Sequence, residues 1–361
     1  MKKAFALAAA ILLLCVVGGS ASAGWETVSL HPAEATSSLA YGVFRGQQAG
    51  VARLGDVRHA ILWSGSATGW VDLNPGGATY SIARGAYADR QVGYANIGGG
   101  YYHHAGLWNG TAESWEDLNP EGATESYGYG ISSGEQVGAA VFGGYSHAAL
   151  WRGTAESWMD IHPTWATKSY AYSVSGGQVA GVARVGVYYS HAIVWSFGSW
   201  VDLNPDGVVN ASAYGVSGGQ QVGVASGHAA LWYSSKSNWR DLNPAGSTGS
   251  CAWGVYGGMQ VGYAQIGGRE HAGLWSGTAE SWVDLHVLLP ADAYSNSAAT
   301  SIFESAGEIW IAGSAYNAST SQEEAMLWHY VVPEPSSLIA LAGGLASLLA
   351  FRRRRTSCSA P

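Results

Sequence analysis

The stretch that decides the fold is "GWETVSLHP", residues 24–32. The same phrase returns as "SWMDIHP" at 157–163 and as "SWVDLHVLLP" at 281–290, where it closes a longer unit that starts with "HA-x-LW". At residues 24–32 the closing phrase stands without the front part of its unit. The position of that missing part determines how the repeats are arranged in space.

The body of the chain is an array of repeats built around the phrase "LW" or "VW". Six of the seven units carry His-Ala just before this phrase, and the seventh has Glu324 at the histidine position. A period in the low forties is typical of four-stranded propeller blades. The tryptophans that mark the units are Trp63, Trp108, Trp151, Trp195, Trp232, Trp275 and Trp328.

Each unit divides into four short phrases, for example "YGVSGG" (214–219), "QVGVA" (221–225), "HAALW" (228–232) and "WRDLNP" (239–244). The phrases are rich in Val, Ile, Tyr and Trp and are bounded by Gly, Asn, Pro or Ser, a pattern typical of strands. With 51 glycines in 361 residues and no sustained helical period, long helices are not expected. The "NP-x-G" phrases indicate tight turns.

The fourth phrase occurs seven times, but it is offset by one unit from the third phrase. It begins the mature chain, whereas the third phrase ends the array at Trp328, so the N-terminal strand can complete the last unit. This predicts an all-β, seven-bladed β-propeller over residues 24–331, closed by the N-terminal strand and without exposed sheet edges. A linear solenoid is the alternative, and it would need capping units at both ends. The fourth-phrase tryptophans are Trp25, Trp70, Trp115, Trp158, Trp200, Trp239 and Trp282.

Residues 1–23 have the features of a signal peptide. Lys2 and Lys3 precede an apolar run, and "ASA" at 21–23 provides small residues for cleavage. Removal of both ends would leave Cys251 as the one cysteine, so no internal disulfide is expected in the exported chain. The full chain carries a formal net charge of −8, which argues against nucleic acid as a partner.

The C-terminal stretch "VVPEPSSLIALAGGLASLLAFRRRR" (331–355) joins a Pro-Glu-Pro triplet, a short apolar segment and an arginine cluster. It resembles the PEP-CTERM sorting signal, which exosortase processes in Gram-negative bacteria. The resemblance implies a sorting signal over 332–361 with a short apolar transmembrane helix, exosortase as a partner, transient membrane tethering, and export to the cell surface or extracellular matrix. A plain membrane anchor is the alternative. The signal residues are Pro333, Glu334, Pro335, Arg352, Arg353, Arg354 and Arg355.

The repeats also resemble the extracellular HAF repeat family. "HAGLW" at 104–108, "WEDLNP" at 115–120 and "EQVGAA" at 135–140 follow the order of that family's units, although Asn-Pro stands here where the family usually has Gly-Thr-Leu. The resemblance implies extracellular repeats and brings no established activity with it.

The repeated histidines sit at one equivalent position in six blades, so they should lie around a ring and cannot converge on a metal ion. We expect each to bond within its own blade to the aspartate of "DL", and we expect no metal and no cofactor. "GISSG" (130–134) and "GVSGG" (215–219) match the hydrolase pattern Gly-x-Ser-x-Gly, but they fall in strand phrases and not at a strand-to-helix turn. No catalytic residue is predicted.

Tyrosines in the glycine-rich connections before "HA" are the candidate binding residues, because loops on one rim of a rigid scaffold often carry function. The predicted function is an exported, non-catalytic binding or structural protein of the cell surface or of the exopolysaccharide biofilm matrix, with exopolysaccharide or surface proteins as partners. The alternative is an extracellular polysaccharide lyase or hydrolase on the same scaffold. The candidate residues are Tyr101, Tyr102, Tyr145, Tyr188 and Tyr189.

Overall fold

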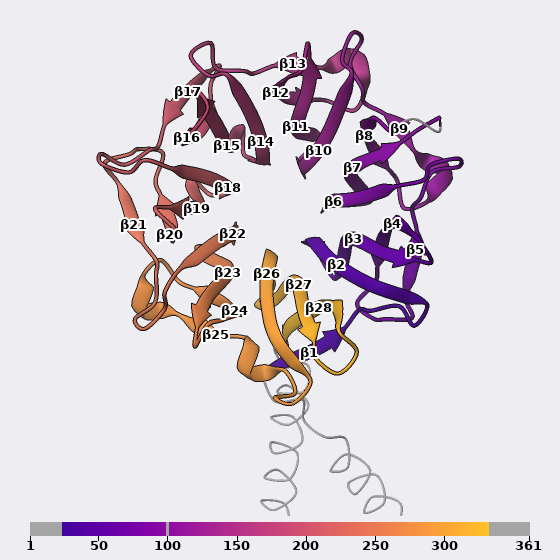
Figure 1. The fold of residues 1–361 in the computed structure, drawn as a ribbon, viewed down its shortest axis with the longest axis vertical. Helices are drawn as coiled ribbons and strands as arrows, with labels where there is room; N and C mark the ends of the chain where they lie inside the picture. Colours follow the sequence, from indigo (N-terminus) through magenta and orange to yellow (C-terminus); the bar gives the residue numbers. More distant parts are fainter. Residues whose placement is uncertain (1–23, 99–100, 332–361) are drawn as a thin grey trace, which may run out of the picture. The chain divides into compact units, whose positions relative to one another are not determined.

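The computed structural model describes residues 24–98 and 101–331, and in this part of the chain 28 strands form seven sheets of four strands each. The sheets are arranged as blades around a central channel, with the first strand of each blade innermost (Figure 1). The predicted seven-bladed propeller is therefore confirmed. The predicted signal peptide (1–23) and the sorting signal (332–361) lie outside the described residues.

The strands of the first six blades follow one another in chain order from the channel outward. Blades 1 to 3 contain β2 (Ala35–Phe44), β3 (Gln47–Leu54), β4 (Val57–Trp63) and β5 (Trp70–Asp72); β6 (Ser81–Tyr87), β7 (Arg90–Asn96), β8 (His103–Trp108) and β9 (Glu116–Asp117); β10 (Glu125–Ser132), β11 (Glu135–Phe142), β12 (Tyr145–Trp151) and β13 (Met159–Asp160). Blades 4 to 6 contain β14 (Lys168–Ser175), β15 (Gln178–Val185), β16 (Tyr189–Ser196) and β17 (Ser199–Asp202); β18 (Ala211–Ser217), β19 (Gln220–Ala225), β20 (His228–Trp232) and β21 (Trp239–Asp241); β22 (Ser250–Tyr256), β23 (Met259–Ile266), β24 (Arg269–Trp275) and β25 (Val283–Asp284).

The described helices are four single turns of 3-10 type. Three of them form on the repeated sequence Gly-Thr-Ala-Glu-Ser between the third and fourth strands, and the fourth follows β25. They are η1 (Ala112–Ser114), η2 (Ala155–Ser157), η3 (Ala279–Ser281) and η4 (His286–Leu288).

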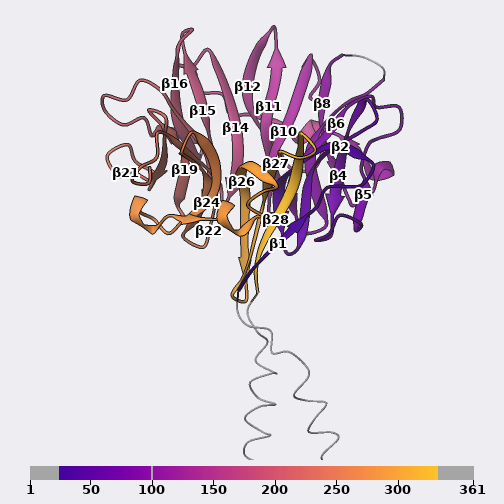
Figure 2. The same cartoon turned by 60° about the horizontal axis from the view of Figure 1, so that its bottom comes forward.

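The seventh blade joins the two ends of the described chain. Its sheet has the order β1 (Gly24–Ser29), β28 (Gln322–Val331), β27 (Glu308–Asn317) and β26 (Tyr294–Ser305), and β1 runs beside β28 (Figure 2). Just after β1, the Leu30 N–H donates to the Ala325 carbonyl oxygen at 2.8 Å. The equivalent bond occurs in every other blade, for instance from the Leu73 N–H to the Ala60 oxygen at 2.8 Å. The phrase "GWETVSL" is thus the outer strand missing from the last blade.

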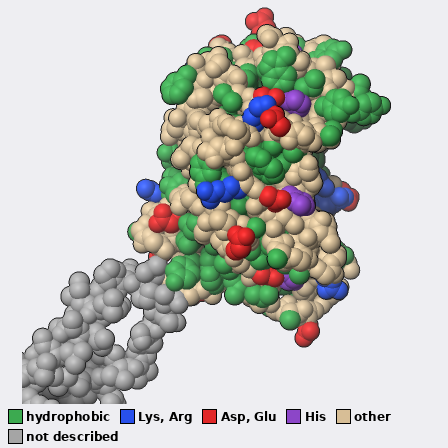
Figure 3. All heavy atoms as spheres, turned by 90° about the vertical axis from the view of Figure 1, so that its left-hand side faces the viewer, with side chains coloured by type: hydrophobic (Ala, Val, Ile, Leu, Met, Phe, Trp, Pro, Cys, Tyr) green, Lys and Arg blue, Asp and Glu red, His purple; other side chains and the backbone are tan. Residues whose placement is uncertain are grey.

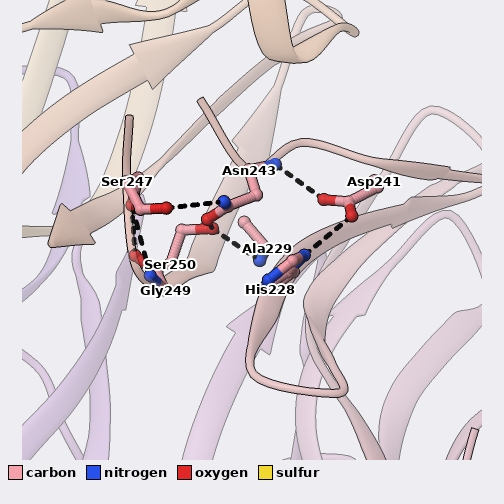
Figure 4. Close-up of polar contacts among 7 residues, drawn as sticks. All are labelled: His228, Ala229, Asp241, Asn243, Ser247, Gly249 and Ser250. Atoms are coloured by element: carbon pink, nitrogen blue, oxygen red, sulfur yellow. Dashed lines mark hydrogen bonds and ion pairs between the residues drawn. The ribbon is translucent and has the colours of Figure 1, made fainter. Parts of the chain in front are cut away.

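Neighbouring blades are joined by a small polar network (Figure 4). The Ser250 hydroxyl, at the start of β22, accepts the Ala229 N–H of the previous blade at 2.9 Å and donates to Asn243 Oδ1 at 2.7 Å. The Asn243 N–H donates to Asp241 Oδ1 at 2.8 Å, and the other oxygen of Asp241 lies 2.7 Å from His228 Nδ1. The repeated histidine therefore orients the turn that leads from one blade to the next.

The same serine joins blades elsewhere in the ring, including the point of closure. Ser38 in blade 1 accepts the Ala325 N–H of blade 7 at 2.9 Å and lies 2.8 Å from His31 Nδ1, which stands in for the asparagine. His162 and His286 replace the asparagine in the same way. The serines that accept the N–H of the preceding blade are Ser38, Ser81, Ser126, Ser169, Ser250 and Ser297.

Between blades 4 and 5 this network is incomplete. Ala211 occupies the serine position, seven residues after Asn204, and its side chain is buried. Asn204 Oδ1 is consequently buried with no hydrogen-bond partner among the described residues. A buried acceptor without a donor costs about 1–3 kcal/mol.

Replacing Leu30 tests the closure. Leu30 is fully buried against residues of both ends of the ring, so Leu30→Ala should lower the free energy of unfolding by about 2–5 kcal/mol, measured by denaturant unfolding. Glu26→Ala, at an exposed position of β1, is the matched control and should change it by less than about 0.5 kcal/mol. Equal and small effects of the two substitutions would show that β1 contributes little to the ring.

Ala211→Ser tests the polar network. The new hydroxyl can donate to Asn204 Oδ1 and should raise the free energy of unfolding by about 1 kcal/mol, whereas Ser250→Ala at the sister position should lower it by roughly 1–3 kcal/mol. The denaturation midpoints of the two variants provide the measurement. A destabilised Ala211→Ser variant would mean that the buried site cannot hold the hydroxyl.

Candidate binding site in the central channel

Each inner strand contains a β-bulge that leaves one residue unpaired. In β10, for example, Gly128 pairs with Gly138 and Gly130 pairs with Val137, so Tyr129 has no partner on β11. A bulge redirects the side chain of its extra residue. The seven bulge residues all line one cavity of about 340 Å³ in the central channel. We call this set the bulge ring: Tyr41, Arg84, Tyr129, Tyr172, Tyr214, Trp253 and Thr300.

Glycines next to the bulges allow the strands to approach closely. A Cβ atom on Gly138 would lie 1.8 Å from the Tyr127 carbonyl oxygen of the inner strand. On Gly130, directly after the bulge, it would lie 2.7 Å from the Tyr172 carbonyl oxygen of the next blade. The glycine-rich composition therefore serves the packing of inner strands around the channel.

The bulge ring is largely aromatic, and its members contact one another across blade boundaries. The ring centroids of Tyr129 and Tyr172 are 5.4 Å apart, as are those of Tyr172 and Tyr214. The guanidinium carbon of Arg84 lies 4.2 Å from the ring centroid of Tyr41, a cation–π contact. Stacking continues beyond the bulge ring, because Tyr127 stacks on Tyr129 at 6.2 Å.

Burial raises the pKa values of three phenols of the bulge ring. Desolvation raises the pKa of Tyr129 well above its ordinary value, and it is also the main cause of the raised pKa values of Tyr172 and Tyr214. At neutral pH these phenols are protonated, so they can donate hydrogen bonds and are poor general bases. This chemistry suits ligand binding better than proton abstraction.

The channel lining has an unusual charge. It includes Arg84 and Arg45 but no aspartate or glutamate, although the chain as a whole has 25 acidic and 17 basic residues. On the side of the molecule seen in Figure 3, the charged side chains are scattered singly or in close pairs, without a large patch of one sign. The channel is thus a positively charged pocket in an acidic protein.

The five tyrosines predicted from the sequence lie on other elements. Tyr101, Tyr102 and Tyr188 lie in the connections before the third strands of blades 2 and 4, whereas Tyr145 and Tyr189 are the first residues of β12 and β16. All five residues are 53% to 95% exposed. We call them the rim tyrosines. In the described residues no ring-to-ring contact joins any two of them, and they are separate from the residues that line the channel cavity. This rim also carries the turns between blades, since the Ser190 N–H donates to Asn210 Oδ1 at 2.9 Å.

The His-Ala histidines and the serines of the two Gly-x-Ser-x-Gly stretches have structural roles. Each of the six His-Ala histidines lies 2.7–2.9 Å from an aspartate oxygen of its own blade, as expected, and the partner of His147 is Asp160. Residues 24–98 and 101–331 contain no cluster of three or more His, Cys, Asp or Glu side chains suited to a metal ion. Ser132 and Ser217 end inner strands that run into tight hairpins.

The bulge ring has a signature in the sequence, in the first of the four phrases of each repeat, which forms the inner strand. In all seven units the bulge residue is larger than the Ala or Gly before it and is followed by Gly or Ser. The pairs are "YG" at 41, "RG" at 84, "YG" at 129, "YS" at 172, "YG" at 214, "WG" at 253 and "TS" at 300. A variable position within an otherwise regular repeat is where binding specificity can be placed.

Titration of the tyrosines tests their burial. Folded-state pKa values raised above the unfolded value of 10.0 contribute stability that is complete below pH 10 and is lost as the pH rises through the folded values. The free energy of unfolding should therefore fall above pH 10, and ultraviolet absorbance should reveal phenols that ionise late. Tyr172→Phe should remove one of the late phenols. Ionisation of every tyrosine at its ordinary value in the folded protein would contradict this assignment.

Comparisons with known proteins identify the sorting signal and the fold. Residues 331–355 match the PEP-CTERM protein-sorting motif, which implies export, surface sorting and exosortase processing. Apart from Val331, the matched residues lie outside the described part of the chain. No curated protein matches the sequence. No helix within residues 24–98 and 101–331 is long and apolar enough to cross a membrane.

Solved structures share the architecture at low sequence identity, which shows the fold alone. An oligogalacturonate lyase in complex with manganese has 13% identity and a TM-score of 0.53, covering 86% of this chain and 95% of that chain. The β-propeller domain of the Trilobed protease from Pyrococcus furiosus, described as having an open velcro topology, has 10% identity and a TM-score of 0.55, with coverage of 81% and 94%. A prolyl endopeptidase has 12% identity and a TM-score of 0.52, and the match covers 83% of this chain.

The chain spans about half the length of that endopeptidase, 51%. The N-terminal strand of the present chain completes its last sheet, so its ring is closed by a strand from the opposite end of the chain. The protein is an exported, exosortase-sorted β-propeller protein.

Proposed function

We propose that the protein is a non-catalytic component of the cell surface or exopolysaccharide matrix that binds an extended polysaccharide through its rim tyrosines. Before exosortase processing, its C-terminal segment would tether it to the membrane. The repeat sequences resemble those of the extracellular HAF repeat family, and this resemblance supports a location outside the cell.

The observation that carries the proposal is the exposure of the rim tyrosines. Tyr102, Tyr145 and Tyr189 each stand two residues before the repeated histidine, in three successive blades, and each is more than half exposed. Aromatic rings that remain exposed on an ordered rim offer apolar faces to sugar rings. Contacts spread over neighbouring blades favour a long polymer held weakly at several points.

A triple substitution tests the role of the rim. Each tyrosine ring should contribute about 1 kcal/mol to binding, so the combined change of Tyr102, Tyr145 and Tyr189 to Ala should weaken polysaccharide binding roughly a hundredfold. Binding is measured with purified propeller on an array of acidic and neutral exopolysaccharides. Single changes should weaken it modestly.

Phe197→Ala is the matched control, because Phe197 is a fully exposed aromatic residue in the hairpin between β16 and β17. It should leave binding unchanged. If the triple variant retains parental affinity with an intact thermal transition, the rim does not bind polysaccharide.

A polysaccharide-active enzyme is the second candidate, and one pair of carboxylates favours it. Glu270 and Glu323 line a common pocket at one end of blades 6 and 7, and burial, followed by the charge of Glu323, raises the pKa of Glu270. Glycoside hydrolysis uses two carboxyl groups, of which one has a raised pKa. Release of reducing ends that is lost in Glu270→Gln and Glu323→Gln would establish this function instead.

A further inference from the structure

We propose that the bulge ring is a second binding site, which takes a sugar bearing a carboxylate, such as a uronic acid unit. The cavity of about 340 Å³ lies at the small end of the range of ligand pockets. The site is distinct from the rim tyrosines, and the proposal holds whether or not the rim binds polymer.

Arg84 provides the charge that the ligand has to match. Its guanidinium is mostly buried among Tyr41, Tyr94 and Tyr129 and interacts with Tyr94 through a side-chain hydrogen bond. Within the described residues no ion pair joins it to a carboxylate. Its Nε–H is buried with no hydrogen-bond partner in the same part of the chain. A buried cation without a counter-ion is costly, and a ligand carboxylate that accepts from the guanidinium would offset that cost.

The remaining bulge residues fit the rest of a sugar. Tyr129, Tyr172, Tyr214 and Trp253 present aromatic side chains to the cavity, suited to the apolar faces of a pyranose ring. The charged side chains near these phenols are Arg84 and Arg184, and the protonated phenols can donate hydrogen bonds to carboxylate or hydroxyl oxygens. Thr300 is already engaged, because its single hydroxyl proton is shared between the Ala40 and Ala312 carbonyl oxygens, which lie 2.8 Å and 3.0 Å from the hydroxyl oxygen. Recognition thus depends on Arg84 and on these four aromatic residues.

The absence of acidic residues from the lining selects against cations and favours anions. A simple anion would use the arginines of the lining alone, whereas an acidic sugar would use both Arg84 and the aromatic residues. The combination of a buried arginine that has no carboxylate partner with several aromatic faces therefore points to the carboxylated sugar as the better match of the two.

Calorimetric titration of the processed protein, recovered from the producing cells, tests the site. The probes are short oligomers of glucuronate and galacturonate, neutral glucose and galactose oligomers of equal length, and acetate and inorganic phosphate. We expect the uronate oligomers to bind more tightly than either the neutral sugars or the simple anions. Arg84→Gln should weaken uronate binding by about tenfold or more, the effect of losing one charge-assisted hydrogen bond.

Arg45→Gln removes the same charge from an exposed hairpin residue of the channel lining and is the matched control. It should change uronate affinity far less than Arg84→Gln, and both variants are checked for an unchanged thermal transition. If Arg84→Gln does not fold, Tyr172→Ala and Trp253→Ala provide the second readout, and each should weaken uronate binding.

The proposal is wrong if neutral and acidic oligomers bind equally, or if acetate or phosphate binds as tightly as the uronates or more tightly. It is also wrong if folded Arg84→Gln keeps full affinity, or if no uronate binds at millimolar concentration. The rim triple variant separates the two proposals. It should retain uronate binding in the channel, and loss of that binding would place the acidic-sugar site on the rim.

Discussion

The closure of the ring is the constraint on which the rest of the structure depends. Within the last blade, the Leu30 N–H donates to the Ala325 carbonyl oxygen, and between blades 7 and 1 the Ser38 hydroxyl accepts the Ala325 N–H. Both bonds repeat the pattern found between strands close in sequence, but here they join residues some three hundred positions apart. Because every inner strand packs against two neighbours, the channel and its lining exist in this form only when the ring is closed.

The sequence was sufficient to predict the architecture because each level of the repeat agrees with the others. The offset between the third and fourth phrases placed β1 in the last blade, and the histidine–aspartate pairs followed from the recurrence of both residues in the same unit. Such regularity constrains a fold strongly, since one wrong register would break every blade at once.

The binding surface was harder to predict, for a physical reason. Exposed tyrosines on glycine-rich loops are visible in the sequence, whereas a bulge depends on backbone register, which a simple alternating pattern does not reveal. In the sequence, Tyr129 and Tyr172 have the pattern of ordinary strand residues, and Arg84 is an isolated charged residue. Only the shift in pairing against β7, β11 and β15 brings these three side chains to one cavity.

The N-terminal strand completes the last blade and so holds the bulge ring around the channel. Hydrogen–deuterium exchange on the processed protein measures this most directly. The amides of Leu30 and Ala325 should be protected as strongly as those of the equivalent residues Leu73 and Ala60 in blade 1, and all should exchange together in global unfolding. Rapid exchange at Leu30 and Ala325 while Leu73 and Ala60 remain protected would contradict it.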